Sequence, residues 1–484
     1  MNAPVRRLSL VVAVLFASLL VSTTLIQYVF AADLNARADN RRTLLSTYAR
    51  ERGDIIVGQN PIAESVPSDD QFKFQRTYAE GPLYAHVTGF YSFYGAAGGL
   101  EQAENALLSG SSDKLFYRRV SDLFTGRRPQ GANIETTLDG AAQQAASEAM
   151  EGIRGAAVAL DPRTGAILAM VSHPTFDPND VAGHDLEAVG ANYEKLNQDE
   201  SRPLVNRAIG GDLYPPGSVF KVVTAAAALS TGKYDEDTVL PGPAVLDLPQ
   251  TSADLPNVFD GPCGPNDEVT FTEAMAISCN TAFASVGMEI GPDALQAQAA
   301  KFGFGDAITI PMRVTPSTIP PEMNAPQLAQ ASIGQYDVRA TPLQMAMVAA
   351  GVANDGVVMR PYLVQSVIGS DLSVIESADE QELSEAVTPE VADQLTRMMV
   401  EVVEDGSGRR AQIDGVTVAG KTGTAQHGEG RKAPAWFISF APADDPEIAV
   451  AVIAEDGGVA GSEAGGGAVA APIARQIMEA RLDR

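Results

Sequence analysis

The sequence predicts an α+β protein in which an antiparallel sheet, covered by helices, is interrupted by a mostly helical lobe. Two apolar runs joined by a turn with Pro162 and Gly165 predict a hairpin, and three further strand-like runs follow residue 415. Alanine-rich helical segments fill residues 200–350 between them. The order is therefore helix, two strands, helical insert, three strands and helix. A cleft between sheet and lobe is the natural place for chemistry.

Changes in composition divide the chain into four segments. We expect residues 1–7 to form a cytoplasmic stub, 8–32 a transmembrane anchor, 33–134 a small accessory domain and 135–484 the main domain. The accessory segment is polar, punctuated by glycine and free of repeats. A chain of 484 residues is long enough for two or three folded units.

Residues 8–32 carry no formal charge and follow Arg6 and Arg7. A helix of that length crosses the roughly 30 Å hydrocarbon layer of a bilayer. The two arginines place the N-terminus in the cytoplasm and the chain after Asp33 outside it. A cleavable signal peptide is the alternative, since residues 29–31 offer a cleavage site, but the apolar run exceeds the usual length of roughly 7–15 residues.

Charge and histidine usage exclude several classes of function. The net charge of −27, with 61 acidic and 34 basic residues, opposes nucleic acid or anionic lipid headgroups as the main partner. The histidines are scattered and no cysteine or histidine spacing typical of zinc sites occurs, so we expect no metal. The four histidines are His86, His173, His184 and His427.

The two cysteines, Cys263 and Cys279, would lie in the oxidising compartment outside the membrane. Their short separation allows a disulfide that closes a loop. Two separate thiols are equally compatible with the sequence, because sequence alone does not show whether the two Cβ atoms meet.

The elements of the main domain can be placed along the chain. Asp139 is a plausible N-cap for an alanine-rich helix of roughly four turns. The hairpin follows at residues 156–172. The later strands are expected at residues 416–426, 435–442 and 447–455, and a closing helix at 466–482.

Three short motifs follow one another along the main domain. They are Ser218-Val219-Phe220-Lys221, Ser278-Cys279-Asn280 and Lys421-Thr422-Gly423. A single Ser-x-x-Lys match is weak evidence, and this chain has two other copies, which start at Ser111 and Ser230. The Ser111 copy lies in a polar loop and the Ser230 copy ends a helix. Ser218 alone lies between a Pro-Pro-Gly turn and an apolar helix, which makes it the candidate nucleophile.

The setting of Ser218 suits nucleophilic catalysis. At the start of a helix, free N–H groups and the helix dipole stabilise developing negative charge. Lys221, three residues on, can approach the Ser218 hydroxyl. If its amine is desolvated its pKa falls, and the neutral amine can accept the Ser218 proton. The alternative is a helix-capping serine beside a solvated lysine.

The other two motifs supply polar partners. Ser278 and Asn280, two residues apart, require a turn or helix junction to point at one site. The Ser278 hydroxyl can relay a proton to a leaving amine, and the Asn280 amide can hold Lys221 and a substrate carbonyl. Lys421 and the hydroxyl of the next residue suit a carboxylate. Gly423 lies in a strand whose exposed edge can pair with an extended peptide.

These motifs, in this order, resemble the active-site motifs of penicillin-binding proteins and serine β-lactamases. Arg52-Gly53 with Ile55 resembles a segment that follows the anchor in class B (monofunctional) members, and Gly99-Leu100-Glu101 resembles their second accessory element. The resemblance covers most of the chain from Arg52 onwards and is strongest to the A-type members of actinobacteria. The chain departs from the pattern at Cys279 and at Tyr336, where glycine is frequent.

The resemblance implies a membrane-bound D,D-transpeptidase with a pedestal-like or dimerisation accessory domain. Ser218 would attack the penultimate D-Ala of a peptidoglycan stem peptide, and an amine of a neighbouring stem would resolve the acyl-enzyme. Lys421 and Thr422 would hold the terminal carboxylate, and the N–H groups of Ser218 and Thr424 would form the oxyanion hole. β-Lactams would acylate Ser218, no cofactor is needed, and a polytopic glycosyltransferase or division protein is the implied protein partner.

Other readings stay open at the level of sequence. A D,D-carboxypeptidase and a β-lactamase share the motifs and differ in whether water reaches the acyl-enzyme. A bifunctional glycosyltransferase would need more than the roughly 100 residues between anchor and main domain. A non-catalytic division scaffold or a β-lactam sensor is the alternative from a different class. The resemblance does not reveal the acceptor amine, the oligomeric state or a choice between elongation and septation.

Overall fold

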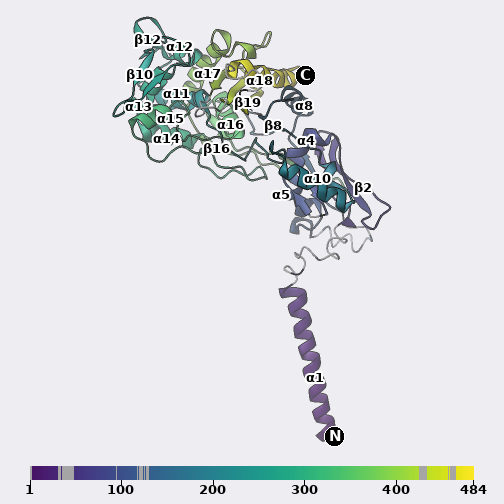
Figure 1. Ribbon diagram of the computed structural model, residues 1–484. Helices are drawn as coiled ribbons and strands as arrows, with labels where there is room; N and C mark the ends of the chain where they lie inside the picture. The colour runs from purple at the N-terminus through teal and green to yellow at the C-terminus, as the bar shows by residue number, and fades with distance from the viewer. Residues whose placement is uncertain are drawn as a thin grey trace.

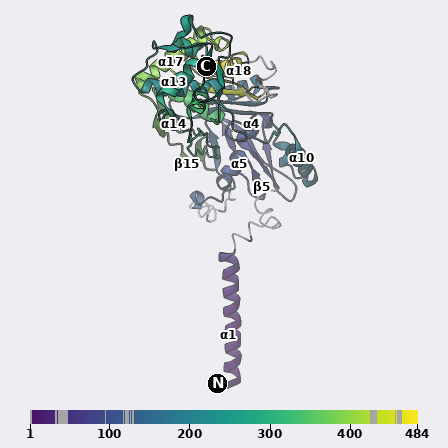
Figure 2. The same ribbon diagram turned by 60° about the vertical axis from the view of Figure 1, so that its left-hand side comes forward.

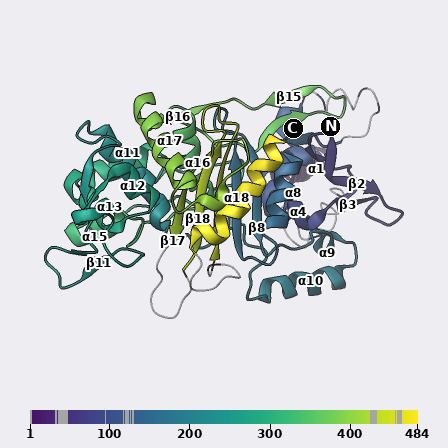
Figure 3. The same cartoon turned by 90° about the horizontal axis from the view of Figure 1, so that it is seen from above.

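A computed structural model describes residues 3–30, 34, 48–93, 95–116, 118, 124, 126, 130–424, 433–455, 457 and 465–483. A long N-terminal helix stands away from the folded body (Figures 1 and 2). Seen from above, the helical lobe lies at one end of the body, the central sheet in the middle and the accessory region at the other end (Figure 3).

The central sheet has five antiparallel strands in the order β17-β18-β19-β7-β8, which confirms the predicted fold class. Both faces of the sheet carry apolar side chains, since helices cover both faces. Helices α8 and α18 pack on one face and α16 on the other, while α17 packs against β17. The bounds are β7 Gly155–Leu160, β8 Ile167–His173, β17 Ala419–Thr424, β18 Ala435–Ala441, β19 Ile448–Ala454, α8 Gly140–Ala149, α16 Pro342–Ala353, α17 Pro389–Glu404 and α18 Gly466–Leu482.

The sequence predicted the start of α8 correctly but not its length. Asp139 is the N-cap as predicted, and its carboxylate accepts hydrogen bonds from the N–H groups of Ala141 and Ala142. The helix has 10 residues and is shorter than the predicted four turns. It ends at Met150 because the chain turns at Gly152, whose φ is 72°.

The helical lobe is built around α11, whose residues Lys221 to Leu229 are all buried. It packs against α13, α14 and α17. A short 3₁₀ turn precedes it, and two small hairpins border the lobe. The bounds are η3 Gly217–Phe220, α11 Lys221–Ser230, β9 Val239–Pro241, β10 Val245–Asp247, β11 Asp254–Pro256, η4 Pro265–Asp267, β12 Glu268–Thr270, α12 Phe271–Ala276, α13 Asn280–Ile290, α14 Pro292–Lys301 and α15 Ala325–Ala331.

The accessory region contains a second sheet, of six strands, in the order β15-β14-β6-β1-β2-β3. Strands β14 and β15 come from the middle of the main domain, and β6 pairs with β14 antiparallel and with β1 parallel. The sheet therefore takes strands from both sides of residue 134, and the predicted boundary there stays a prediction. The bounds are β1 Ile55–Val57, β2 Asn60–Pro67, β3 Phe74–Tyr78, β6 Asn133–Thr136, β14 Val364–Ile368 and β15 Val374–Ser377.

Short elements complete the two ends of the body. Helix α9 packs against β3 and β4, and α10 packs against α9. The bounds are α4 Gly81–Thr88, β4 Phe90–Ser92, β5 Gly95–Ala97, α5 Gly99–Ala103, α6 Asn105–Leu108, η2 Asp113–Leu115, α9 Asn179–Ala182, α10 Leu186–Gln198, β13 Val357–Met359, β16 Glu382–Glu385 and η5 Arg409–Ala411.

A buried charge cluster joins the two accessory segments singled out in the sequence. Glu101 is 0% exposed and accepts hydrogen bonds from Arg52 Nε at 2.5 Å and Arg76 Nε at 2.6 Å. Tyr78 donates its hydroxyl to the same carboxylate at 3.2 Å, and the Arg52 guanidinium lies over the ring of Tyr91. The cluster thus holds the segment that contains Arg52 against α5.

The N-terminal helix α1 spans Ala3–Thr24 and continues as a π-helical turn over Leu25–Val29. Among the described residues this is the one helix long and apolar enough to cross a membrane. It begins before the predicted span, so Arg6 and Arg7 lie in its first turns. The predicted end of the span at Ala32 lies outside the described residues, as does His427.

Candidate active site

The three motifs meet in one cleft between the lobe and the sheet. Ser218 lies on η3, Ser278 lies in the turn between α12 and α13, and Thr422 lies on β17. A cavity of about 580 Å³ is lined by Ser218, Ser278, Thr422 and Thr424. A second cavity of about 330 Å³ is lined by Ser218, Asn280 and Thr424. Ser218 thus stands where the two cavities meet.

The competing copies of the first motif lie elsewhere. Ser111 belongs to a loop of the accessory region, and Ser230 is the last residue of α11, at the opposite end of the helix from Ser218. Neither Ser111 nor Ser230 lines the two cavities of the cleft.

Lys221 is fully buried and its amine faces the second motif. Its Nζ donates to Ser278 O at 2.8 Å, to Ser278 Oγ at 3.2 Å and to Asn280 Oδ1 at 2.8 Å. Burial lowers the pKa of Lys221 well below its ordinary value, and the charge of Lys421 lowers it further. The acceptors are neutral, so they hold the amine in place without restoring its charge.

Ser278 adopts φ 61°, a left-handed conformation that ends α12 and lets α13 begin at Asn280. The predicted helix junction is therefore present. It turns both the carbonyl and the hydroxyl of Ser278 toward Lys221. Ser278 and Asn280, which cannot share one face of a regular helix, therefore both bind the Lys221 amine.

Ser218 lies on a 3₁₀ turn, and the α-helix expected to start at Ser218 begins only at Lys221. Gly217 N–H donates to Gly334 O at 2.9 Å, and Trp436 Nε1 donates to Pro215 O at 3.1 Å. Gly334 has φ 72°, and a Cβ there would lie 2.1 Å from Gly217 O. The backbone of Gly334 and the side chain of Trp436 thus fix the turn.

Gly423 supports the same turn. A Cβ at this position would lie 3.0 Å from Val219 Cγ1 and 3.1 Å from Pro216 O. The missing side chain therefore makes room for the turn that carries Ser218. Strand β17 is the edge strand of the sheet, which leaves its other edge for an extended ligand.

Lys421 lies behind the wall of the cleft. Its side chain is fully buried, and its Nζ donates to Thr422 O at 3.0 Å. Burial lowers the pKa of Lys421 to about 7. The Thr422 hydroxyl is hydrogen bonded to Ser407 Oγ at 2.6 Å and lines the larger cavity together with Thr424.

Several residues of the cleft were missed by sequence reasoning. Arg409 and Arg410 line the larger cavity, and Asp254 lines the smaller one. Asn257 contacts the start of α13 from the hairpin β10–β11. None of them stands in a spacing that marks a motif, so only the folded arrangement identifies them.

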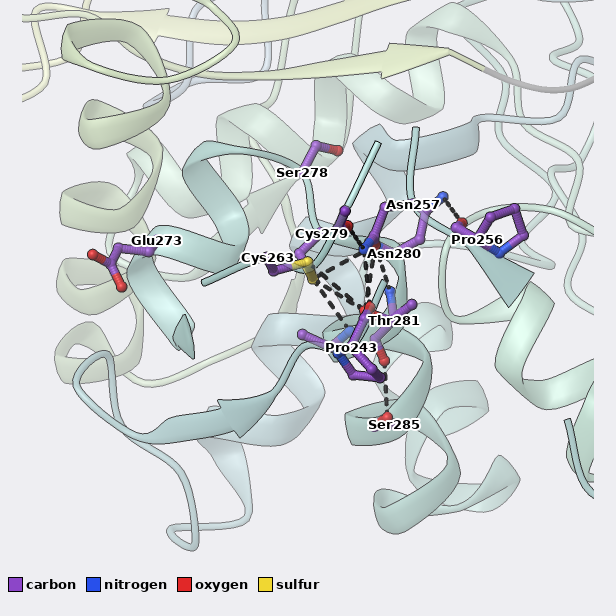
Figure 4. Close-up of a disulfide and its surroundings, with 12 residues drawn as sticks. Pro243, Pro256, Asn257, Cys263, Glu273, Ser278, Cys279, Asn280, Thr281 and Ser285 are labelled. Carbon is purple, nitrogen blue, oxygen red and sulfur yellow. Dashed lines mark hydrogen bonds between the residues drawn. A yellow bond between two sulfur atoms is a disulfide. The ribbon is translucent and has the colours of Figure 1, made fainter. Parts of the chain in front are cut away.

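The two cysteines are joined. Cys263 and Cys279 form a disulfide with a Cα–Cα distance of 5.9 Å, which settles the alternative left open by the sequence (Figure 4). The bond ties the loop after β11 to the residue between Ser278 and Asn280.

Taken together, the cleft can perform acyl transfer. A hydroxyl on a fixed turn, a buried amine with a lowered pKa and a second hydroxyl on that amine form a nucleophile, a base and a proton relay. Threonine hydroxyls beside a lysine suit a carboxylate.

Comparison with known proteins gives consistent results. Residues 155–479 match the model of the penicillin-binding protein transpeptidase domain, and residues 52–134 match that of the penicillin-binding protein A dimerisation domain. The peptidoglycan D,D-transpeptidase PbpA of Mycolicibacterium smegmatis is 48% identical over 492 aligned residues, covering 100% of this chain and 99% of the relative. The PbpA of Mycobacterium tuberculosis is 44% identical, covering 100% and 99%.

Solved structures agree with these relatives. The ceftriaxone acyl-enzyme complex of penicillin-binding protein A from M. tuberculosis matches with a TM-score of 0.87 at 44% identity, covering 90% of this chain and 100% of that one. The penicillin G acyl-enzyme complex of the same protein matches with a TM-score of 0.85 at 43% identity, with the same coverage.

Proposed function

The chain belongs to the family of penicillin-binding protein transpeptidases, and we propose that Ser218 is the nucleophile of its peptidoglycan D,D-transpeptidase reaction. One observation carries the assignment of Ser218. Residues of all three motifs line the two cavities that share Ser218, and Lys221, three residues on in the chain, has a pKa lowered by burial. The acyl-enzyme structures of the relative from M. tuberculosis support a serine-type mechanism.

In the proposed first half-reaction, neutral Lys221 accepts the proton of Ser218 as Oγ attacks the penultimate D-Ala carbonyl. The N–H groups of Ser218 and Thr424 stabilise the oxyanion. The C–N bond then breaks, and the leaving D-Ala amine receives a proton from the Lys221 ammonium through Ser278 Oγ, which lies 3.2 Å from Nζ. The acyl group remains on Ser218.

In the second half-reaction an acceptor amine attacks the ester carbonyl. It loses a proton to Lys221, which is neutral again, and the Ser218 oxygen leaves and regains its proton. The cycle returns each group to its starting state and makes one new amide. β-Lactams would enter at the first step and leave Ser218 acylated.

The charges of the cleft support an orientation for the donor peptide. Its terminal carboxylate is proposed to bind at Thr422 and Thr424, with the cation of Lys421 behind them. Arg409 and Arg410 line the same cavity and favour an anion there. The extended stem would pair with the free edge of β17.

Helix α1 is proposed to anchor the enzyme, with the N-terminus in the cytoplasm and the catalytic body outside. Arg6 and Arg7 support this orientation. A polytopic glycosyltransferase or division protein is the proposed partner, reached through the anchor and the accessory region.

The assignment can be tested with the full-length chain in detergent. Ser218→Ala should abolish labelling by a fluorescent penicillin and the formation of crosslinked product, whereas Ser111→Ala and Ser230→Ala should label normally. Intact mass should show a single penicilloyl adduct. Labelling of Ser218→Ala at another serine would overthrow the assignment.

The same experiment separates the alternatives. Release of the penicilloyl group within seconds would indicate a β-lactamase, and D-Ala release without crosslinking in the presence of acceptor would indicate a carboxypeptidase. If the protein were a non-catalytic scaffold, cells whose only copy is the Ser218→Ala variant would still grow.

A further inference from the structure

We propose that Asn257 is a positioning residue for this reaction: it orients Asn280 and, through Asn280, the general base Lys221. This inference rests on the proposed function of Ser218 and Lys221. Asn257 lies 23 residues before Asn280, at the end of β11, and belongs to none of the three motifs. No described contact joins it to Ser218, so it acts through other residues.

Asn257 caps α13 from outside the helix. Its Oδ1 accepts hydrogen bonds from Asn280 N at 3.0 Å and from Thr281 N at 3.2 Å, which are free N–H groups of the first helical turn (Figure 4). The residue at the N-cap position, Cys279, offers only the sulfur of a disulfide, 3.4 Å from Ala282 N. The amide of Asn257 therefore supplies the oxygen that a serine or aspartate gives in an ordinary cap.

The neighbouring carbonyl fixes the side chain of Asn280. Asn280 Nδ2 donates to Pro256 O at 3.1 Å, and Asn280 Oδ1 accepts from Lys221 Nζ at 2.8 Å. A carbonyl oxygen cannot donate, so a flipped amide would lose the bond to Pro256 O, which fixes Asn280 Oδ1 toward Lys221. Consecutive residues of one loop thus hold the main chain and the side chain of Asn280.

The loop itself is held by the other end of the Asn257 amide. Asn257 Nδ2 donates to Pro243 O at 3.1 Å and to Gly261 O at 3.3 Å. Thr281 Oγ1 also donates to Pro243 O, at 2.9 Å. The side chain is only 9% exposed and uses both its donors and its acceptor.

These contacts form a single path from the loop to the base. The path runs from Asn257 Oδ1 to the backbone of Asn280, through the Asn280 side chain, to Lys221 Nζ. The amine also depends on the Ser278 carbonyl, in the turn directly before α13. Releasing the start of α13 would therefore loosen two acceptors of the general base at once.

Two substitutions test the proposal in the full-length chain. Asn257→Ala removes the cap and should lower the second-order rate constant of acylation by a fluorescent penicillin by about 10- to 100-fold, part of the roughly 10²–10⁴-fold effect of a general base. Asn257→Asp keeps an oxygen for the two N–H groups but loses the hydrogen bonds from Nδ2 to Pro243 O and Gly261 O, so it should recover part of that loss at high pH.

The pH profile distinguishes positioning from folding. The carboxylate of Asn257→Asp adds a negative charge two hydrogen bonds from Lys221, which favours the ammonium and raises its pKa. Fewer neutral amines are then present at a given pH, so the rising limb of the acylation profile should move to higher pH. A purely structural loss would lower the rate without moving the limb.

Asp185→Ala is the matched control. Asp185 Oδ1 accepts from two N–H groups at the start of α10, each at 3.1 Å, and α10 lies at the other end of the body (Figure 3). This variant should lose a cap and keep the wild-type acylation rate and profile. The proposal is overturned if Asn257→Ala acylates like the wild type, or if the rising limb of the Asn257→Asp profile lies at the same pH as that of the wild type. Failure of wild-type acylation at Ser218 would instead reject the proposed function.

Discussion

Replacing Glu101 by glutamine removes the negative charge that two buried arginines share. Arg52 is 5% exposed, Arg76 is 2% exposed and Glu101 is 0% exposed. Burial alone would raise the pKa of Glu101, but Arg76 and Arg52 outweigh it and hold the pKa below its ordinary value. The variant keeps the shape of the side chain and leaves two guanidinium groups facing an amide.

The cost follows from what each arginine retains. Arg52 keeps hydrogen bonds to Asn105 Oδ1 at 2.8 Å and to the backbone carbonyl of Glu101 at 2.9 Å. Arg76 keeps less, because its two Nη atoms have no hydrogen-bond partner within the described residues. Breaking a buried ion pair on one side costs about 3–5 kcal/mol. We therefore expect Glu101→Gln to lower the free energy of unfolding by about 3–5 kcal/mol at neutral pH, most of it from Arg76.

Urea unfolding followed by far-ultraviolet circular dichroism measures this loss. Glu479→Gln is the control, since Glu479 pairs with Arg475 at 2.8 Å on the partly exposed face of α18 and should cost less than about 0.5 kcal/mol. A loss below about 1 kcal/mol for Glu101→Gln would refute the view of the cluster as a desolvated charge pair.

The same pair of proteins has a predictable pH dependence. Because the folded pKa of Glu101 lies below its unfolded value, its contribution is complete above the unfolded pKa of about 4.3. It is lost as the pH falls through the folded pKa. The stability difference between wild type and Glu101→Gln should therefore shrink below about pH 4, and a difference that grew on acidification would contradict the assigned shift.

Three further predictions concern the cleft. Gly334→Ala places a Cβ 2.1 Å from Gly217 O and should lower the β-lactam acylation rate at least 10-fold in stopped-flow assays. A change only in the Kd of the β-lactam, with an unchanged acylation rate, would contradict this prediction. Since burial lowers the pKa of Lys221 and its neutral amine is the proposed base, the acylation rate should rise with pH and reach its plateau below the ordinary lysine pKa of about 10.4; a rise that continued to pH 10 would reject this base. Replacing Cys263 and Cys279 by alanine opens a bond between residues 16 apart and should cost about 3 kcal/mol in urea unfolding, which unchanged stability would disprove.

Features encoded by near neighbours were predictable from sequence. The Asp139 cap depends on N–H groups two and three residues away, and the Ser278 turn follows from the two-residue spacing to Asn280. The central sheet was predictable because β7, β8, β18 and β19 are apolar runs bounded by turn residues. The confirmed fold rests on these local patterns.

Features that depend on distant contacts were not predictable. Asn257 shows no periodicity or motif, and its role depends on α13 folding beside it. The disulfide required the Cβ positions of Cys263 and Cys279. The 3₁₀ turn at Ser218 depends on contacts from the backbone of Gly334 and the side chain of Trp436, which lie more than 100 residues away. The roles of the eight predicted cleft residues stay proposals, although the structure brings them together.

The shared accessory sheet has a consequence for how such proteins can be recombined. Strand β6 lies between β1, which precedes it in the chain, and β14, which is separated from it by more than 200 residues. A gene cut at residue 134 would divide β6 itself, strip β14 and β15 from the upstream fragment and expose the edge of β1. Neither fragment is then a complete unit that could be moved into another protein. Exchanges between relatives should succeed only when residues 364–377 are exchanged together with the N-terminal segment. The unit that can be exchanged is therefore defined by contacts in space and not by the order of the gene.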